Sequence, residues 1–411
     1  MSRMAAVDAQ FYWMSAKVPN DQFLLYAFAG EPKDLEGAID EVCNRARGCP
    51  DLAMRVEDGG ALSYPRWVAA AVESTQVVRH EPAEQSWRGC LDAVAALADS
   101  QLDIRQMPWR LHIFTAIRGI PGCAGGGVVA VLQVAHALAD GTRASALAAW
   151  LFGREVWVPR VDVPSPGCLL RRAADAARTH HRLVCDTRAG LLSPAASPRP
   201  PVATNVRPDG ARTLRTVVRK RTEMPGATVT VGALAAVSTA LFELLDGSAD
   251  ALGAEVPIAK PGVRQAHNHF GNVVVGLYPQ LAVDARMERI AADLAHGRRR
   301  FQHPAAFSAD RAFAAVPAPL LRWGVAHFDP TVRPVLVAGN TVLSSVYRGA
   351  GDLHFGGAPV VLTAGYPALS PSMGLTHGVH GIGDTIAISV HAAASAVADV
   401  DAYVRCLDSV L

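Results

Sequence analysis

The residues best suited to chemistry lie together, at the end of one apolar stretch. Residues 127–135 are mostly apolar and β-branched, His136 follows, and Asp140 and Gly141 precede a second apolar run, residues 144–152. A neutral imidazole, with an ordinary pKa of about 6.5, accepts a proton at cellular pH, and a strand end holds such a group in place. The sequence therefore predicts His136 as a general base, with Asp140 holding the loop by capping the helix or pairing with an Arg. Spacing alone leaves a second interpretation open, in which His136 is a polar strand end and Asp140 only a helix cap.

The elements that position these residues alternate irregularly between helical and strand periodicity, which predicts a mixed α/β fold without repeats. Helical spacing occurs at residues 35–46, 87–97, 144–152, 231–245, 286–301, 305–323 and 399–411. Strand-like runs occur at residues 23–29, 111–116, 127–135, 254–259, 272–281, 341–347, 359–363, 374–380 and 385–391. Turn residues at 381–384 predict an antiparallel hairpin between the last two strands.

Residues 158–209 differ in composition from the rest of the chain. They are rich in proline, and their one strong periodicity is a basic helix around residues 168–184. Proline-rich composition is typical of a connecting segment. We therefore expect an N-terminal lobe at residues 1–157, a crossover at 158–209 and a C-terminal lobe at 210–411.

Composition excludes several classes of protein. Of the 411 residues, 50% are hydrophobic and 18% charged, which excludes dominant disorder, and the net charge of +2 offers nucleic acid no overall attraction. The seven cysteines form no C-x-x-C pair, which predicts reduced thiols and no zinc site. The chain starts without a signal-peptide pattern and contains no uninterrupted apolar run of about 20 residues. We expect a cytoplasmic protein, with peripheral contact to a membrane or lipid droplet left open.

Residues 136–141 resemble the H-H-x-x-x-D-G motif of the bacterial wax ester synthase/diacylglycerol acyltransferase (WS/DGAT) family, within the chloramphenicol acetyltransferase-like CoA-dependent acyltransferases. Further segments resemble family elements in the same order. They are residues 6–11 (L-S-x-x-D-x-x-F), 108–109 (P-L-W), 227–234 (T-V-N-D-V), 256–258 (V-P-V), 271–272 (G-N) and 356–360 with the last strands (the closing sheet). Because order and spacing are kept over nearly the whole chain, the sequence is identified by resemblance as a member of this family.

The sequence departs from the family pattern at a few positions. Ala135 stands at the first His of the doublet, Thr230 and Val231 replace the N-D pair, and residues 344–349 read S-S-V-Y-R-G in place of S-N-V-P-G-P. Successive side chains of a strand point to opposite faces, so residues 135 and 136 cannot both face a reaction centre. In this superfamily the second His is the base, which corresponds to His136.

The resemblance implies two similar lobes, each a mixed sheet flanked by helices, with His136 in the middle of a channel between them. It implies that His136 takes the hydroxyl proton of a long-chain alcohol or diacylglycerol, which attacks acyl-CoA in a ternary complex without an acyl-enzyme. Acyl-CoA is a co-substrate, and no other cofactor or metal is expected. Asp140 would orient the loop, and the residues expected to contact substrate are Gly141, Asn272, Ser344 and Ser345, one of the two serines as oxyanion donor.

Two other functions stay open beside this one. The chain is alternatively a non-catalytic or specialised relative that binds acyl chains or a partner protein, a hypothesis motivated by Ala135, Thr230, Val231 and Ser345. It is alternatively an acyltransferase for a polyketide, a glycolipid or a carrier-protein-bound substrate.

Several further histidines and arginines have a structural interpretation. Residues 267–269 (H-N-H) have no third ligand at metal-site spacing, so we expect a loop. His377, His380 and His391 lie in the last strands, where a histidine is usually structural, although one of them could line the channel. The arginines of the crossover form either a solvated helix face or a contact for CoA phosphates or anionic lipid.

Overall fold

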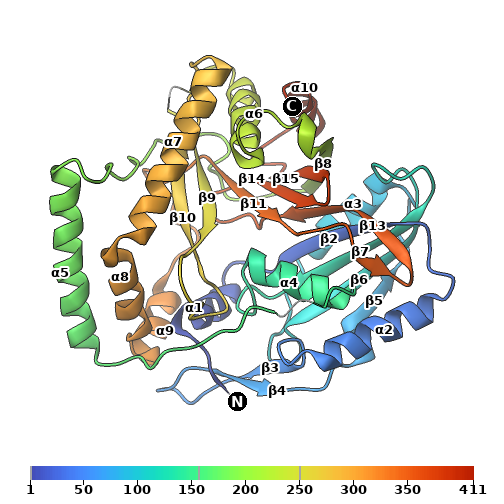
Figure 1. Ribbon diagram of the computed structural model, residues 1–411, viewed down its shortest axis with the longest axis horizontal. Helices are drawn as coiled ribbons and strands as arrows, with labels where there is room; N and C mark the ends of the chain where they lie inside the picture. The colour runs from blue at the N-terminus through green and yellow to red at the C-terminus, as the bar shows by residue number, and fades with distance from the viewer. Residues whose placement is uncertain (1, 156–157, 250) are drawn as a thin grey trace.

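Two six-stranded sheets form the centre of the computed structural model, which describes residues 2–155, 158–249 and 251–411 (Figure 1). The first sheet has the order β12-β13-β2-β7-β6-β5. Its strands are β2 (Gln22–Ala29), β5 (Val77–His80), β6 (Trp109–Ile117), β7 (Gly127–Val134), β12 (His354–Phe355) and β13 (Ala358–Tyr366). The pair β5–β6 is parallel, and the other pairs are antiparallel.

The second sheet has the order β10-β9-β11-β14-β15-β8. Its strands are β8 (Arg212–Lys220), β9 (Gly253–Ala259), β10 (Phe270–Gly276), β11 (Thr341–Tyr347), β14 (Leu375–Ile382) and β15 (Thr385–Ala393). Strand β11 runs parallel to both of its neighbours, and β14 and β15 form the predicted antiparallel hairpin. A smaller sheet joins β1 (Ser2–Arg3), β4 (Arg66–Ala69) and β3 (Met54–Glu57). The mixed α/β fold with two lobes is thus confirmed.

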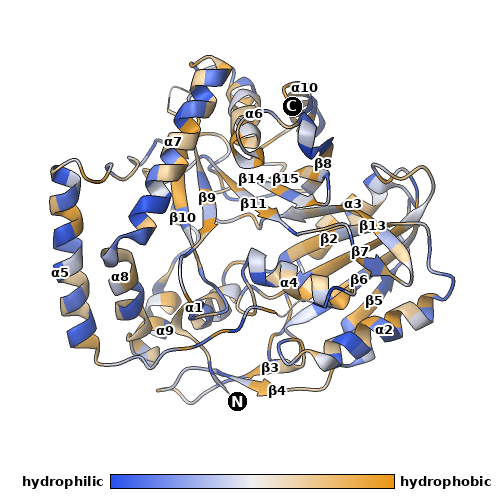
Figure 2. Cartoon of the chain, viewed as in Figure 1, coloured by the Kyte–Doolittle hydropathy of each residue, from blue (hydrophilic) through white to orange (hydrophobic). Residues whose placement is uncertain are grey.

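Helices flank both sheets (Figure 1). They are α1 (Ala6–Ser15), α2 (Leu35–Gly48), α3 (Trp87–Leu97), α4 (Gly141–Leu151), α5 (Leu169–Arg188), α6 (Val229–Leu244), α7 (Val283–Gln302), α8 (Pro304–Ala314), α9 (Ala318–His327) and α10 (Val400–Ser409). Hydropathy follows this arrangement, since the central strands are mostly apolar whereas α5 and α7 at the periphery carry many polar residues (Figure 2). None of the described helices combines the length and the apolar composition that crossing a bilayer requires.

The first sheet includes two strands from the later part of the chain. Strands β12 and β13 belong to the predicted C-terminal unit, 210–411, yet β13 pairs with β2 in the first sheet, with Thr363 opposite Tyr26. The predicted boundaries do not include this pairing across the two halves of the chain, because a periodicity identifies a strand but not its partner. The predicted boundary at residue 157 lies outside the described residues. In the predicted crossover, the basic helix is α5, which packs against α8.

Some predicted elements have different limits. The helix expected at 305–323 is two helices, α8 and α9, because Pro317 disfavours helical geometry at the preceding residue and begins the next helix. The strand expected at 272–281 spans Phe270–Gly276, since the backbone of Tyr278 turns into the left-handed region with a φ of 48°. Helix α1 and strands β1, β3, β4, β5, β8 and β12 were not predicted from the sequence.

Candidate active site

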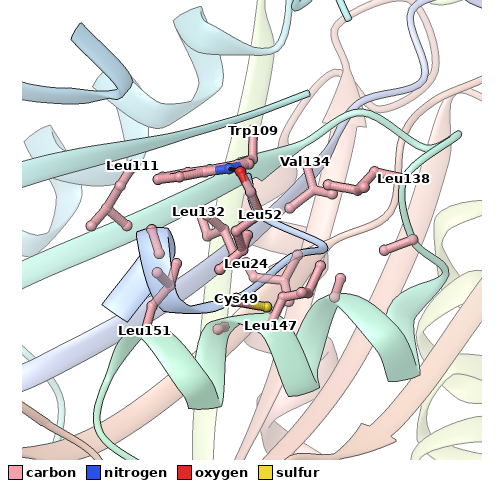
Figure 3. Close-up of a cluster of buried hydrophobic side chains, with 14 of the residues drawn as sticks. Leu24, Cys49, Leu52, Trp109, Leu111, Leu132, Val134, Leu138, Leu147 and Leu151 are labelled. Atoms are coloured by element: carbon pink, nitrogen blue, oxygen red, sulfur yellow. Dashed lines mark hydrogen bonds between the residues drawn. The ribbon is translucent and has the colours of Figure 1, made fainter. Parts of the chain in front are cut away.

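A rigid support carries the predicted motif. Strand β7 is buried at all eight residues, and Ala135 continues it by donating its N–H to the Pro108 carbonyl at 3.0 Å. Figure 3 shows the apolar cluster that fixes both sides of the loop, with Leu138 beside Val134 and Leu147 on α4. The loop is therefore held between a buried strand and a buried helix face. Ala135 packs into this core and does not line the cavity described below, so the first position of the doublet is an interior position.

His136 is held by aromatic stacking. Its ring lies on Phe11 of α1, with centroids 3.9 Å apart and planes 3° from parallel, and Phe270 of β10 lies 5.9 Å away. Burial lowers the pKa of His136 below its usual value, so the imidazole is neutral at cellular pH and able to accept a proton. Its Nδ1 is buried without a hydrogen-bond partner among the described residues, and the ring lines a large cavity. Nε2 is the ring nitrogen that is not enclosed in this way.

Asp140 fulfils both roles that the sequence left open. As the N-cap of α4 it accepts a hydrogen bond from the Arg143 N–H at 3.0 Å. Its carboxylate also pairs with Arg264, with Nη1 at 2.7 Å from Oδ2, and accepts the His269 N–H at 2.8 Å. The sequence could not identify Arg264, which lies 124 residues further along the chain. Asp140 thus joins the motif loop to the loop that precedes β10.

A second buried carboxylate holds the same loop from the other side. Asp8 of α1 accepts hydrogen bonds from the backbone N–H groups of His267 and Asn268 and from Asn268 Nδ2, each at 2.9 Å. Asn268 Nδ2 also donates to the His136 carbonyl at 2.7 Å. Burial raises the pKa of Asp8 to about 7. Residues 6–11 stand out in the sequence only as a family resemblance, so neither Asp8 nor Asn268 was predicted to position His136.

The cavity beside His136 has a volume of about 770 Å³ and lies between the two sheets. Both halves of the chain contribute residues, among them Phe23, Leu24, His136, Gly141, Thr230, Val256, Phe270, Asn272, Leu294, Ser344, Ser345, Arg348 and His380. Its volume falls within the range of about 300–1,000 Å³ that is common for ligand sites. The structure thus brings all six predicted site residues, with Asp140 among them, to one cavity.

The predicted substrate-contacting residues differ in how they are engaged. Ser345 Oγ and Thr230 Oγ1 share a hydrogen bond at 2.8 Å. Thr230 stands where the family has the Asn of its N-D pair, and Ser345 where it has the Asn of S-N-V-P-G-P, so two positions that depart from the family pattern contact each other. Ser344 lines the cavity and its hydroxyl makes no hydrogen bond to a residue in the described parts of the chain. Asn272 is exposed on β10, where Nδ2 donates to Glu255 at 3.0 Å, which leaves it at the cavity edge.

The remaining histidines are mostly structural. Residues 267–269 form a loop, as expected, and His267 stacks on Trp67 with centroids 5.0 Å apart. His377 bonds to Tyr403 at 2.8 Å in the second core, whereas His380 lines the cavity. Across residues 2–155, 158–249 and 251–411, no three His, Cys, Asp or Glu side chains are grouped so as to hold a metal ion.

One family model matches the C-terminal part of the chain. Residues 267–411 match the WS/DGAT C-terminal domain. The wax ester synthase/diacylglycerol acyltransferase from Marinobacter aquaeolei VT8 superimposes with a TM-score of 0.64 at 17% identity, covering 100% of this chain and 98% of that chain. None of the curated protein sequences matches the chain.

Two further solved structures share the fold. A starter condensation domain of rhizomide synthetase, in complex with C8-CoA and Leu-SNAC, gives a TM-score of 0.58 at 13% identity over 99% of this chain and 93% of that one. The trichothecene 15-O-acetyltransferase from Fusarium sporotrichioides gives a TM-score of 0.58 at 11% identity, covering 99% of this chain and 94% of that chain. The resemblance predicted from the sequence is confirmed: residues 267–411 match the WS/DGAT C-terminal domain, and the whole chain shares the two-lobed fold of the wax ester synthase/diacylglycerol acyltransferase.

Proposed function

We propose that the protein is an O-acyltransferase that moves a fatty acyl group from acyl-CoA to a lipid hydroxyl, with His136 as general base. One observation supports this above the others: a neutral imidazole, stacked on Phe11 and held through its backbone by Asn268, lines the wall of a large cavity between the lobes. A solvated or metal-binding role does not require such positioning. The position of Ala135 further supports activity. This residue, where the sequence departs from the family motif, packs in the core and does not line the cavity.

The reaction follows from a base at this position. The His136 imidazole accepts the acceptor's hydroxyl proton while the oxygen attacks the thioester carbonyl, forming a C–O bond. The C–S bond then breaks, and the imidazolium returns the proton to the departing CoA thiolate, so that the imidazole is regenerated. General-base assistance of this kind contributes a factor of about 10² to 10⁴ to the rate.

Stabilisation of the oxyanion requires a donor on the cavity wall. We assign this role to the Ser344 hydroxyl, because its neighbour Ser345 is already bonded to Thr230. Asp140 acts at a distance from the reacting atoms, through Arg264 and the His269 backbone.

The apolar part of the cavity supports a lipid substrate. The cavity is lined by residues of β9 and β11 and by the apolar side chains of Phe23, Leu24, Phe270 and Leu294. Transfer of an acyl chain from water to such a surface is favourable. Solved relatives of this fold include a complex with C8-CoA, which supports acyl-CoA as donor. Peripheral contact with a membrane or lipid droplet stays a proposal.

The test is release of thiol from palmitoyl-CoA with and without hexadecanol or diacylglycerol. We expect acceptor-dependent release by the wild type and a loss of about 10² to 10⁴-fold in His136→Ala. The matched control is His180→Ala, on the exposed side of α5, which should keep full activity. Equal rates for wild type and His136→Ala would overturn the assignment, and acyl-chain binding without release in either protein would favour a non-catalytic binder.

A further inference from the structure

Arg348, directly after β11, is buried without a counter-charge. Its side chain is 5% exposed, and both of its hydrogen bonds start at Nη1, which donates to Thr363 Oγ1 and to the Ala364 carbonyl. Nε has no partner, and no carboxylate pairs with this guanidinium anywhere in the described chain. Burial lowers the pKa of Arg348. A buried charge in this position is costly unless an anion compensates it.

The other two deeply buried arginines of the described chain have partners that Arg348 lacks. Arg143 forms an ion pair with Asp51 at 2.6 Å, although its Nε also makes no hydrogen bond within the described residues. Arg286 donates to five oxygen atoms through Nε, Nη1 and Nη2, in a way typical of an arginine that ties loops together. Arg348 has neither arrangement: its Nε makes no hydrogen bond, and no carboxylate pairs with it in the described residues.

Arg348 lines the cavity and has no carboxylate partner among the described residues. The Tyr26 ring lies against the guanidinium, with its centroid 5.1 Å from Cζ, and burial raises the pKa of this phenol, which stays neutral. His380 also lines the cavity, and its Nδ1 is buried without a partner in the described residues. A Cβ at Gly365 would lie 2.9 Å from Arg348 Nη2 and 2.8 Å from His380 Cε1, so this glycine lets both groups pack closely against the backbone of β13.

Arg348 faces the same cavity as His136. Arg348, Gly365 and His380 line the same cavity, and Val346 of β11 lies against Gly141, next to Asp140. A strand advances about 3.3 Å per residue, so the Arg348 backbone lies about 7 Å beyond that contact. A molecule that reaches His136 with a hydroxyl can therefore reach Arg348 with its other end.

We propose that Arg348, with His380 beside it, is a subsite of the acyl-transfer cavity that binds a substrate carboxylate, so that the acceptor is a hydroxylated carboxylic acid. The planar guanidinium matches a carboxylate with two parallel hydrogen bonds. The phosphates of CoA, which carry several charges, are costlier to desolvate at so buried a position. Arg348 stands where the family stretch S-N-V-P-G-P has Gly, so the sequence marks this subsite as a feature in which the chain departs from the pattern. This inference deepens the proposed function, on which its account of the acceptor rests.

Binding can be measured without turnover, in the His136→Ala protein, by isothermal titration calorimetry. The probes are 12-hydroxydodecanoate, its methyl ester and 1-dodecanol. We expect the acid to bind at least tenfold more tightly than the ester, and Arg348→Met to reduce the acid to the affinity of the ester while leaving the ester unchanged. The matched control is Arg333→Met, which removes an exposed arginine that does not line the cavity.

A second arm identifies which substrate carries the carboxylate. Hexadecanedioyl-CoA, a thioester with a free terminal carboxylate, is compared with palmitoyl-CoA in the same protein. An Arg348-dependent preference for either the hydroxy acid or the dicarboxylic thioester supports a carboxylate subsite. A preference for the thioester would show that the carboxylate belongs to the acyl donor and not to the acceptor. Equal affinity of acid and ester together with equal affinity of the two thioesters, measured with Arg348 intact, overturns the proposal even if Arg348→Met does not fold.

The failure of this subsite and of the proposed function are separable. Full thiol release by His136→Ala with Arg348-dependent acid binding would remove the general base and keep the subsite. His136-dependent transfer to hexadecanol, with no preference for any carboxylate probe, would keep the function and remove the subsite.

Discussion

Replacing Asp140 by Asn tests how the loop around His136 is held. Asn keeps a side-chain oxygen for the Arg143 N–H and is as good a helix cap as Asp. It removes the charge that pairs with Arg264, and in this pair the Arg264 and Asp140 side chains are only 10% and 6% exposed. Water therefore cannot replace the lost partner, and the substitution separates the capping role from the ion pair.

The expected cost follows from this burial. Removing one partner of a buried ion pair destabilises a protein by about 3–5 kcal/mol, mostly because the other charge remains unpaired. Arg264 retains the His267 carbonyl at 2.9 Å, which places the expected loss near the lower limit, about 3 kcal/mol. Adding Arg264→Met removes the orphaned charge, so the double variant should lose less than the sum of the single variants.

Urea unfolding of the two single variants and the double variant measures this coupling. The control is the cycle for Asp175 and Arg178 on α5, an exposed pair that should couple by less than about 1 kcal/mol. The argument is refuted if Asp140→Asn costs less than about 1 kcal/mol, or if the buried cycle couples no more strongly than the exposed one. Acyl transfer should fall in both single variants, since each releases the loop that holds His136.

Three further outcomes follow from burial around the site. The pKa of His136 lies below 6.5, so kcat/KM should be flat above pH 7 and fall only below pH 6.5; an acidic limb centred at pH 7 or higher would contradict a buried neutral base. Phe11→Ala frees one face of that ring and should lower kcat by about tenfold or more with a smaller change in KM, which steady-state kinetics at saturating acceptor can check. Burial lowers the pKa of His112 to about 4 and that of His377 to about 3, whereas an unfolded histidine titrates near 6.5. The unfolded chain then binds more protons, so stability is greatest above pH 6.5 and falls by about 2 kcal/mol per such histidine at pH 5; His377→Gln should reduce this loss in urea unfolding at pH 5 and 7.5, and an unchanged difference would count against it.

The sequence predicted best what local periodicity determines. The limits of α3, β7 and β11 agree with prediction to within about one residue, because each has a clear apolar pattern bounded by turn residues. The His136 loop was predicted for the same reason, as a buried strand leads directly into a capped helix. Strand β8 was missed because its arginines and threonines obscure the alternation of a half-buried edge strand.

Long-range pairing was beyond the reach of a single sequence. The partner of Asp140 lies 124 residues away, and the contact of Asp8 with Asn268 spans 260 residues. A periodicity contains no information on such pairs, and neither does the abundance of arginine. For the same reason the exchange of β13 into the first sheet was not predicted.

The residues that hold His136 make no use of the Ala135 side chain. His136 is fixed from three directions: Phe11 stacks on its ring, Asn268 bonds its carbonyl, and Arg264 bonds the carboxylate that ends its loop. None of these contacts involves the side chain at residue 135, which faces the core on the other side of the strand. Two of the three come from the loop before β10, in the second half of the chain. The position of His136 therefore depends on how the two halves of the chain meet, so we expect a substitution in that loop to alter the site as directly as one beside His136.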